Sequence, residues 1–252
     1  MSPFPFKPED VILLFDTETS GLPLFKEPSD HPEQPRIIQL TALLCDWKGS
    51  KLSSLDALIY HEGLRLSEDI RSLTGHTDAK LAAGGVPIYD AMNLFLAMMS
   101  RASLVVAHNI GFDNRMIRIE LKRAGRVAEA DYWRDAGKSF CTMAATRPIL
   151  RLPPTEKMRQ TARFADSYKS PNLAEAYRWA TGKNLNGAHN AMYDVLAVKA
   201  ILFALAEFHR TMAPEKIAEP AGKTGGTDGQ AGGSPRQRPI SVAAPIETKE
   251  AW

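Results

Sequence analysis

Two carboxylates stand two residues apart where an apolar segment of the chain ends. Asp16 closes the run VILLFD at residues 11–16, and Glu18 follows just before the turn residues Ser20 and Gly21. Side chains alternate along a β-strand, so a strand here places Asp16 and Glu18 on one face. Burying an unpaired charge is unfavourable, so two acids at the edge of a core suggest a functional role. A strand that leaves the core for a turn also carries acids, so the pair alone decides nothing.

Two further acids fall on the core-facing stripes of predicted helices. Asp113 opens a helix whose apolar positions follow at helical spacing, at Met116, Ile117 and Leu121. As a first-turn acid, Asp113 also complements the helix dipole, which is a purely structural role. Asp194 shares a stripe with Ala197, Val198, Ile201 and Leu205, where an unpaired ionised acid is expensive.

His189 precedes Asp194 by five residues, which is about 140° around a helix. The two side chains therefore converge on one centre only if His189 lies in a loop or a first turn, for which Asn186 and Gly187 provide the sequence. A single histidine is also often a surface or capping residue.

The four acids taken together indicate a metal site. Four clustered carboxylates repel one another, and two divalent cations would balance their charge. Hard oxygen ligands without thiolates favour Mg²⁺ or Mn²⁺ over Zn²⁺. A pair of such ions stabilises the charge on the attacking and leaving oxygens in displacement at phosphorus.

The composition is that of an ordinary globular protein. The 252 residues are 44% hydrophobic and 24% charged, enough for one large domain or two small ones. The only cysteines, Cys45 and Cys141, lie far apart, which argues against a disulfide scaffold or a zinc finger and favours a reducing, cytoplasmic location. No secretory signal or membrane-spanning segment is expected, so a membrane partner is not predicted.

The elements that must position these residues form a mixed α/β pattern. Strands are predicted at 11–16, 36–46 and 52–60, joined as an antiparallel meander with a proline-rich loop at 22–35 between the first two. After the meander, strands and helices alternate. We expect a helix at 87–100, a strand at 103–107 and a helix beginning near Asp113.

The rest of the chain continues this alternation and then changes character. We expect a short strand running into a helix at 139–150, a helix capped by Asn172 and ended by Gly182, and a long helix at 190–208. Residues 1–212 are interpreted as the folded domain and residues 213–252, rich in Gly and Pro, as a flexible tail. The tail is either a plain linker or a tether to a partner.

Positive charge is concentrated in the middle of the chain. Residues 114–183 carry 15 Lys and Arg against 7 Asp and Glu. This surplus is typical either of solvated helix faces or of a side that meets a polyanion. On the second interpretation, four basic residues of one helix would follow phosphates: Arg115, Arg118, Lys122 and Arg123.

Three segments give the chain a family resemblance. FDTETSGL at 15–22, AHNIGFDNRMI at 107–117 and GAHNAMYDV at 187–195 resemble the three motifs of the DEDDh 3′–5′ exonucleases, the group that includes the proofreading subunit of bacterial replicative DNA polymerase. Order and spacing agree over roughly residues 10–208.

The resemblance implies an RNase H-like fold with a mixed five-stranded sheet flanked by helices. It implies that Asp16, Glu18 and Asp194 bind one catalytic Mg²⁺, that Asp113 supports a second, and that Mn²⁺ can substitute. His189 would be the general base, accepting the proton of the attacking water. The product would be a nucleoside 5′-monophosphate released from a 3′ end, with DNA favoured as substrate.

The resemblance also implies substrate contacts, at Thr17, Thr19, Leu22, His108, Asn109 and Phe112. Stacking or wedging by Leu22 and Phe112 is weighed against simple core packing. Residues 72–75 resemble, more weakly, the family's loop beside the terminal sugar.

Several alternatives remain open. The loop at 22–35 and the polar segment at 151–171 are candidates for covering the site or selecting the strand, and they leave DNA against RNA undecided. An exoribonuclease acting on short RNA is the second hypothesis. The third is a non-catalytic adaptor that holds a polymerase or helicase through the tail, although no sliding-clamp-binding motif is found there.

Overall fold

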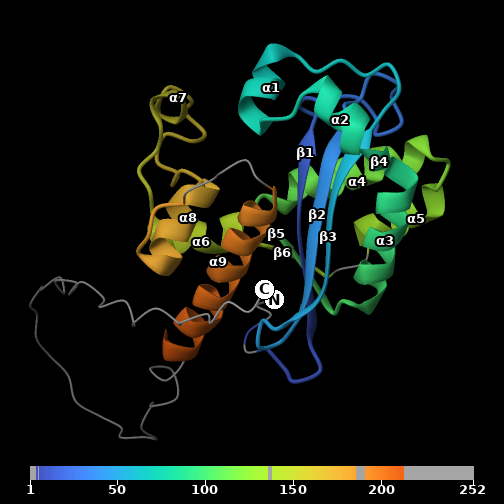
Figure 1. Cartoon of the computed structure of the whole chain (residues 1–252). Helices are drawn as coiled ribbons and strands as arrows, with labels where there is room; N and C mark the ends of the chain where they lie inside the picture. The colour runs from blue at the N-terminus through green and yellow to red at the C-terminus, as the bar shows by residue number, and fades with distance from the viewer. Residues whose placement is uncertain (1–3, 5, 136–137, 186–190, 213–252) are drawn as a thin grey trace, which may run out of the picture.

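One mixed β-sheet forms the centre of the molecule (Figure 1). The computed structural model describes residue 4 and residues 6–135, 138–185 and 191–212. The strand order across the sheet is β4-β3-β2-β1-β5-β6. The strands are β1 (Val11–Thr19), β2 (Ile37–Asp46), β3 (Lys51–Tyr60), β4 (Val86–Pro87), β5 (Leu104–Ala107) and β6 (Ser139–Cys141).

The sheet combines the predicted meander with parallel strands. β1 pairs antiparallel with β2, and β2 with β3, whereas β5 runs parallel to both β1 and β6. The RNase H-like mixed sheet is thus confirmed, but it has six strands where five were expected. The additional strand is β4, whose two residues pair with the end of β3 and are too few to give a periodic signal.

Gly85 explains how β4 reaches the sheet. A Cβ atom at this position would lie 2.7 Å from the backbone nitrogen of Tyr60, a separation that a side chain does not tolerate. The absence of a side chain therefore lets the chain pass close to β3 before it enters the next helix.

Helices cover both faces of the sheet (Figure 1). They are α1 (Glu68–Thr74), α2 (Asp78–Gly84), α3 (Ile88–Arg101), α4 (Ile110–Arg123), α5 (Val127–Asp135), α6 (Thr142–Leu150), α7 (Glu156–Arg159), α8 (Leu173–Thr181) and α9 (Ala191–Met212). Among the described helices, none combines the length and the apolar character needed to cross a bilayer.

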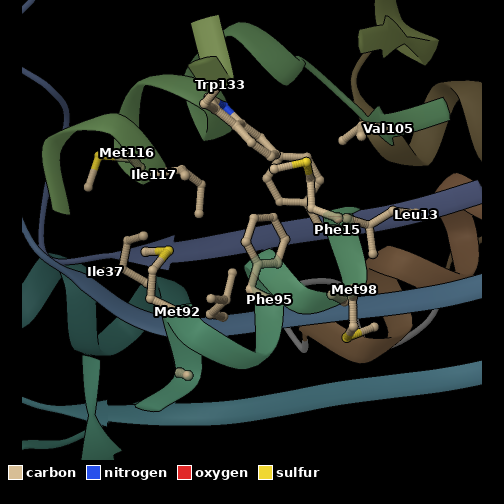
Figure 2. Close-up of a cluster of buried hydrophobic side chains, with 14 of the residues drawn as sticks. Leu13, Phe15, Ile37, Met92, Phe95, Met98, Val105, Met116, Ile117 and Trp133 are labelled. Atoms are coloured by element: carbon tan, nitrogen blue, oxygen red, sulfur yellow. The ribbon is translucent and has the colours of Figure 1, made fainter. Parts of the chain in front are cut away.

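The larger core lies between the sheet and the helices α3, α4 and α5. Phe15 on β1 meets Phe95 of α3 and Trp133 of α5, with ring centroids 5.2 and 5.8 Å apart (Figure 2). Such edge and tilted aromatic contacts add to the free energy of burying the rings. This core fixes one face of β1 against the helices that precede and follow β5.

The second core lies on the other face of β1, under α9. Ile12 and Leu14 pack with Val195 and Val198, which follow Asp194 in the helix. The predicted alternation along β1 is confirmed by this division, since Phe15 belongs to the first core and Leu14 to the second. The packing holds the start of α9 beside the carboxyl end of β1.

Local signals predicted most element bounds well. Asn172 caps α8 through a capping box with Glu175, and Gly182 ends that helix in the left-handed region with φ of 71°. Helix α4 begins at Ile110 instead of near Asp113, because Asn109 turns the chain directly after β5. The predicted tail, residues 213–252, lies outside the described residues.

Candidate active site

Three carboxylates meet at the carboxyl end of β1. Asp16 and Glu18 lie on the face of β1 that α9 covers, and Asp194 is in the first turn of α9. One carboxylate oxygen from each of the three lies within 4.8 Å of the others. Asp194 is 7% exposed and its two partners are half-buried, so the cluster stands at the boundary between core and solvent.

Asp113 approaches β1 from the opposite face. Thr17, between the two acids of β1, points toward α4 and donates to Oδ1 of Asp113 from both its amide nitrogen, at 3.1 Å, and its hydroxyl, at 2.8 Å. Asp113 is 3% exposed. The structure thus brings all four predicted acids to one end of β1, three in direct proximity and the fourth tied to the intervening threonine.

This concentration of negative charge shifts the pKa values of the acids. Burial, and then the charges of Asp113, Glu18 and Asp194, raise the pKa of Asp16 well above its usual value. Burial and the charges of Asp194 and Asp113 raise the pKa of Glu18 to about 7. Burial raises the pKa of Asp113 to about 7, although the hydrogen bonds from Thr17 act in the other direction. The ionised cluster is therefore electrostatically unfavourable on its own.

A buried polar network that the sequence analysis missed lies beside Glu18. Gln39 is the cross-strand partner of Glu18, and its side-chain nitrogen Nε2 donates to Oδ1 of Asp56 at 2.7 Å. The side-chain oxygen Oε1 of Gln39 lies 2.7 Å from Nε2 of His76, whose Nδ1 lies 3.0 Å from Nζ of Lys80.

The donor pattern fixes the protonation of His76. Because the Lys80 ammonium only donates, Nδ1 of His76 accepts and its Nε2 carries the proton that goes to Gln39. Burial and the Lys80 charge lower the pKa of His76, in agreement with a neutral ring. The network ties the segment after Thr74 to β2 next to the acids, and no periodic pattern in the sequence signals it.

His108 and Asn109 shape the turn that leads from β5 into α4. Nδ1 of His108 lies 3.0 Å from the Thr142 hydroxyl, and its Nε2 lies 3.0 Å from the Pro171 carbonyl oxygen. Asn109 has φ of 69°, a left-handed conformation that asparagine adopts more readily than most residues. A substrate contact was predicted for His108, but both of its ring nitrogens face partners within the chain.

The remaining predicted contact residues differ in how far they are exposed. Leu22 is 76% exposed, so the packing alternative is wrong for this residue. Phe112 is half-buried and packs against the larger core. Thr19 is buried and donates to the Gly21 carbonyl at 2.9 Å. Thr74 ends α1 and is buried, with Leu73 beside it 51% exposed.

Two of the basic residues predicted to follow phosphates instead hold the loop at 22–35. Arg115 donates to the carbonyl oxygens of Leu24, at 2.9 Å, and Glu27. Arg123 donates to the carbonyl oxygen of Gln34 at 2.8 Å. A folded loop carries many carbonyl groups that need donors, and the guanidinium groups of Arg115 and Arg123 supply some of them.

Gln34 completes this arrangement from within the loop. It is 3% exposed, accepts from the Leu24 amide at 2.9 Å and donates to the Pro28 carbonyl at 2.9 Å. The loop directly after the acids of β1 is consequently bonded to α4 along its length. His189, the predicted general base, lies outside the described residues.

Comparison with known proteins identifies one family model and a group of similar structures. The family model, RNase_T, described as an exonuclease, matches residues 13–202. No curated protein is significantly similar to the chain in sequence.

The similar structures include two of Exonuclease I from E. coli and one from Methylocaldum szegediense. The E. coli enzyme in complex with a dT13 oligonucleotide gives a TM-score of 0.59 at 19% identity, over 82% of this chain and 42% of that one. Its zinc-bound complex with single-stranded DNA gives a TM-score of 0.58 at 17% sequence identity, and the match covers 82% of this chain and 42% of that one. The moderately thermophilic M. szegediense enzyme gives a TM-score of 0.58 at 18% sequence identity, and the match covers 82% of this chain and 41% of that one. The likeness is one of fold, and the present chain spans less than half of the length of these proteins.

Proposed function

We propose, because the chain belongs to the RNase_T family of exonucleases, that it removes nucleotides one at a time from the 3′ end of a DNA strand. Family membership confirms the resemblance stated from the three motifs, so the domain is an exonuclease domain of the DEDD 3′–5′ type. The observation that carries the proposal is the cluster of Asp16, Glu18 and Asp194, whose carboxylate oxygens lie within 4.8 Å of one another.

The donor set of this cluster fits divalent cations. It offers hard carboxylate oxygens and no sulfur, which suits Mg²⁺ and Mn²⁺. Burial and mutual repulsion make the ionised carboxylates unfavourable, and bound positive charge removes that cost. Asp16, Glu18 and Asp194 would hold one Mg²⁺ and Asp113 would support a second, with Mn²⁺ as a substitute.

The chain's own residues would then prepare the reaction. Bound cations supply the positive charge that stabilises the attacking and leaving oxygens of the phosphodiester. His189 would accept a proton from the attacking water, since an imidazole titrates near neutral pH. It precedes α9, whose first residue is Ala191, by two positions, which keeps it close in the chain to Asp194. The released product would be a nucleoside 5′-monophosphate.

Contacts to the terminal nucleotides would come from the turns beside the acids. The exposed Leu22 would press against a terminal base, and the accessible part of Phe112 would stack on its neighbour. Thr19 and Asn109 would offer backbone groups. Thr17 and His108 would act indirectly, because their donors already hold Asp113 and the Pro171 carbonyl.

DNA is favoured over RNA by the similar structures. E. coli Exonuclease I was solved with the oligodeoxynucleotides dT13 and dA16. The second candidate, an exoribonuclease, uses the same cluster and differs only in how the 2′-hydroxyl is treated. Docking of a polymerase through residues 213–252, and a reducing, cytoplasmic location, are further predictions.

A paired substrate assay tests the choice between the two nucleic acids. DNA and RNA strands of one sequence, each with a 5′ fluorophore, are incubated with the full chain and Mg²⁺ or Mn²⁺. We expect a ladder that shortens from the 3′ end, with faster turnover of DNA. Faster turnover of RNA would overturn the DNA assignment, and shortening of neither strand with either ion would overturn the exonuclease.

A further inference from the structure

A closed loop of the chain has no role in the site described above. Residues 152–169, called the arm below, leave α6 and return to α8, and the Lys169 amide donates to the Leu152 carbonyl at 3.0 Å across their base. The arm is ordered within itself: Thr155 caps α7, and the Phe164 amide donates to the Thr161 carbonyl at 2.8 Å. In Figure 1 the arm projects beside α8, with α7 at its end.

The arm does not serve the hydrophobic core. Every residue from 152 to 169 is half-buried or exposed. Ordering a backbone costs about 1–2 kcal/mol per residue, and here no buried side chain of the arm offsets that cost. Long ordered surface loops of this kind usually have a function.

The exposed side chains of the arm include several basic residues and two aromatic ones. Phe164 and Tyr168 are 44% and 46% exposed, and the Arg163 guanidinium lies 5.5 Å from the centre of the Phe164 ring. Lys157 and Arg159 are exposed as well, and among the described residues the Arg159 side chain forms only a solvent-exposed ion pair, with Glu156 at 3.3 Å. The segment 151–171 holds five basic and two acidic residues. Rings that stack on bases, next to cations that meet phosphates, are what proteins use to bind single-stranded nucleic acid.

The base of the arm is anchored next to the carboxylates. His108 contacts Thr142, where α6 starts, and Pro171, just before α8. It also follows β5, which pairs with β1 so that Val106 is level with Leu14. His108 lies two residues after Val106, and Asp16 lies two residues after Leu14. Because β1 and β5 are parallel, both residues are at the same edge of the sheet. A strand whose 3′ end lies at Asp16 therefore has the arm beside it.

We propose that the arm binds the single-stranded nucleic acid that leads away from the 3′ end at the carboxylate cluster. Phe164 and Tyr168 stack on bases, while Arg159 and Arg163 contact phosphates. This inference rests on the proposed exonuclease function. It specifies that the arm contributes to the binding of long substrates and leaves the chemistry at the terminal bond unchanged.

Binding without turnover tests the stacking contacts. The full chain carrying Asp16→Asn is titrated against a 5′-fluorescent DNA of about twenty nucleotides, longer than a typical single-strand site, in metal-free buffer. Adding Phe164→Ala and Tyr168→Ala should weaken binding by about tenfold or more, because base stacking contributes roughly 1–3 kcal/mol per base. The matched control is Tyr132→Ala, since Tyr132 is 55% exposed on α5, on the other side of the sheet, and its loss should leave binding unchanged.

Salt dependence tests the phosphate contacts separately. Arg159→Gln with Arg163→Gln should reduce the slope of log affinity against log salt by about 1.4, from two phosphate contacts on a single strand. Arg101→Gln, at the exposed end of α3, should not change the slope. An unchanged affinity in the aromatic variant, or an unchanged slope in the arginine variant, would overturn the proposal and leave a protein partner for the arm.

Turnover of long and short substrates separates this inference from the proposed function. In the otherwise unchanged enzyme, the arm variants should raise KM for the long strand and leave kcat and KM for a dinucleotide as they are. Equal losses on both substrates would contradict the arm's role. If the unsubstituted enzyme cleaves neither substrate, the proposed function fails, while the binding titration still decides whether the arm holds nucleic acid.

Discussion

Thr17 contacts Oδ1 of Asp113 twice, through its amide nitrogen at 3.1 Å and its hydroxyl at 2.8 Å. The neighbouring residues Asp16 and Glu18 point to the opposite face of β1, toward Asp194. Thr17 therefore fastens one carboxylate beside the three clustered ones. Because side chains alternate along β1, acids that approach the strand from both faces come close enough for the charge of Asp113 to raise the pKa of Asp16.

The Thr17 hydroxyl should contribute measurably to stability. Thr17→Val keeps the size of the side chain and removes the donor to a buried carboxylate, so we expect a loss of about 1–3 kcal/mol in the free energy of unfolding. Thr17→Ser, which keeps the donor, should lose less. Urea denaturation of both variants measures this, and a Thr17→Val protein as stable as the unsubstituted one would show that the hydroxyl bond contributes nothing.

The raised pKa of Glu18 predicts a pH-dependent stability. An acid whose pKa is raised on folding holds its proton more tightly in the folded state, so stability falls as pH rises through that raised value of about 7. Glu18→Gln removes this loss. Without metal, the variant should therefore be more stable than the unsubstituted protein at about pH 8, by about 1 kcal/mol or more, and the gain should shrink toward about pH 5.

Thermal melting in the presence of a chelator at several pH values measures this gain. The matched control is Glu62→Gln, an exposed acid whose charge is not among those that raise the pKa of Asp16 or Glu18, and it should show no pH-dependent gain. A constant difference between Glu18→Gln and the unsubstituted protein at all pH values would count against repulsion at Glu18.

Cation binding should stabilise the fold through the cluster. A ligand that binds only the folded state raises its stability, by about 2.7 kcal/mol at a hundred times its Kd. Mg²⁺ or Mn²⁺ should thus raise the melting temperature of the unsubstituted protein and have little effect on Asp194→Asn. Equal shifts in the two proteins would place the bound ion elsewhere.

The loop at 22–35 should depend on one side chain. Gln34→Ala removes the bonds to the Leu24 amide and the Pro28 carbonyl, so we expect a loss of about 2 kcal/mol and faster proteolytic cutting in the loop. Glu33→Ala, at the exposed neighbouring position, is the control. Equal cutting rates in the two variants would mean that Arg115 and Arg123 hold the loop without Gln34.

Local sequence patterns predicted the parts of the fold that depend on near neighbours. The alternation of β1 placed Asp16 and Glu18 on one face, and the capping residues Asn172 and Gly182 gave both ends of α8. The helical stripe after Asp194 predicted buried positions of α9, where Val198 packs against the sheet and Ile201 and Leu205 pack against α8. Each of these depends on spacing within a few residues, which a sequence displays directly.

Long-range hydrogen bonds were not predictable in this way. Arg115 and Arg123 are half-buried basic residues on α4, and only the fold shows that they donate to loop carbonyls. The link between His76 and Gln39 joins residues 37 positions apart. The same holds for His108, whose partners Thr142 and Pro171 come from other elements. The type of each residue indicates which partners it could bind, but the partner that it does bind depends on tertiary packing.

The most direct test of the central claim is the rate at which Asp16→Asn shortens a 5′-labelled DNA strand with Mg²⁺, beside the unsubstituted chain. The carboxylate cluster is predicted to carry the reaction, so this near-isosteric variant should fold with an unchanged or higher melting temperature and lose about a thousandfold or more in rate. A folded Asp16→Asn protein that shortens the strand from its 3′ end at the unsubstituted rate would contradict the account.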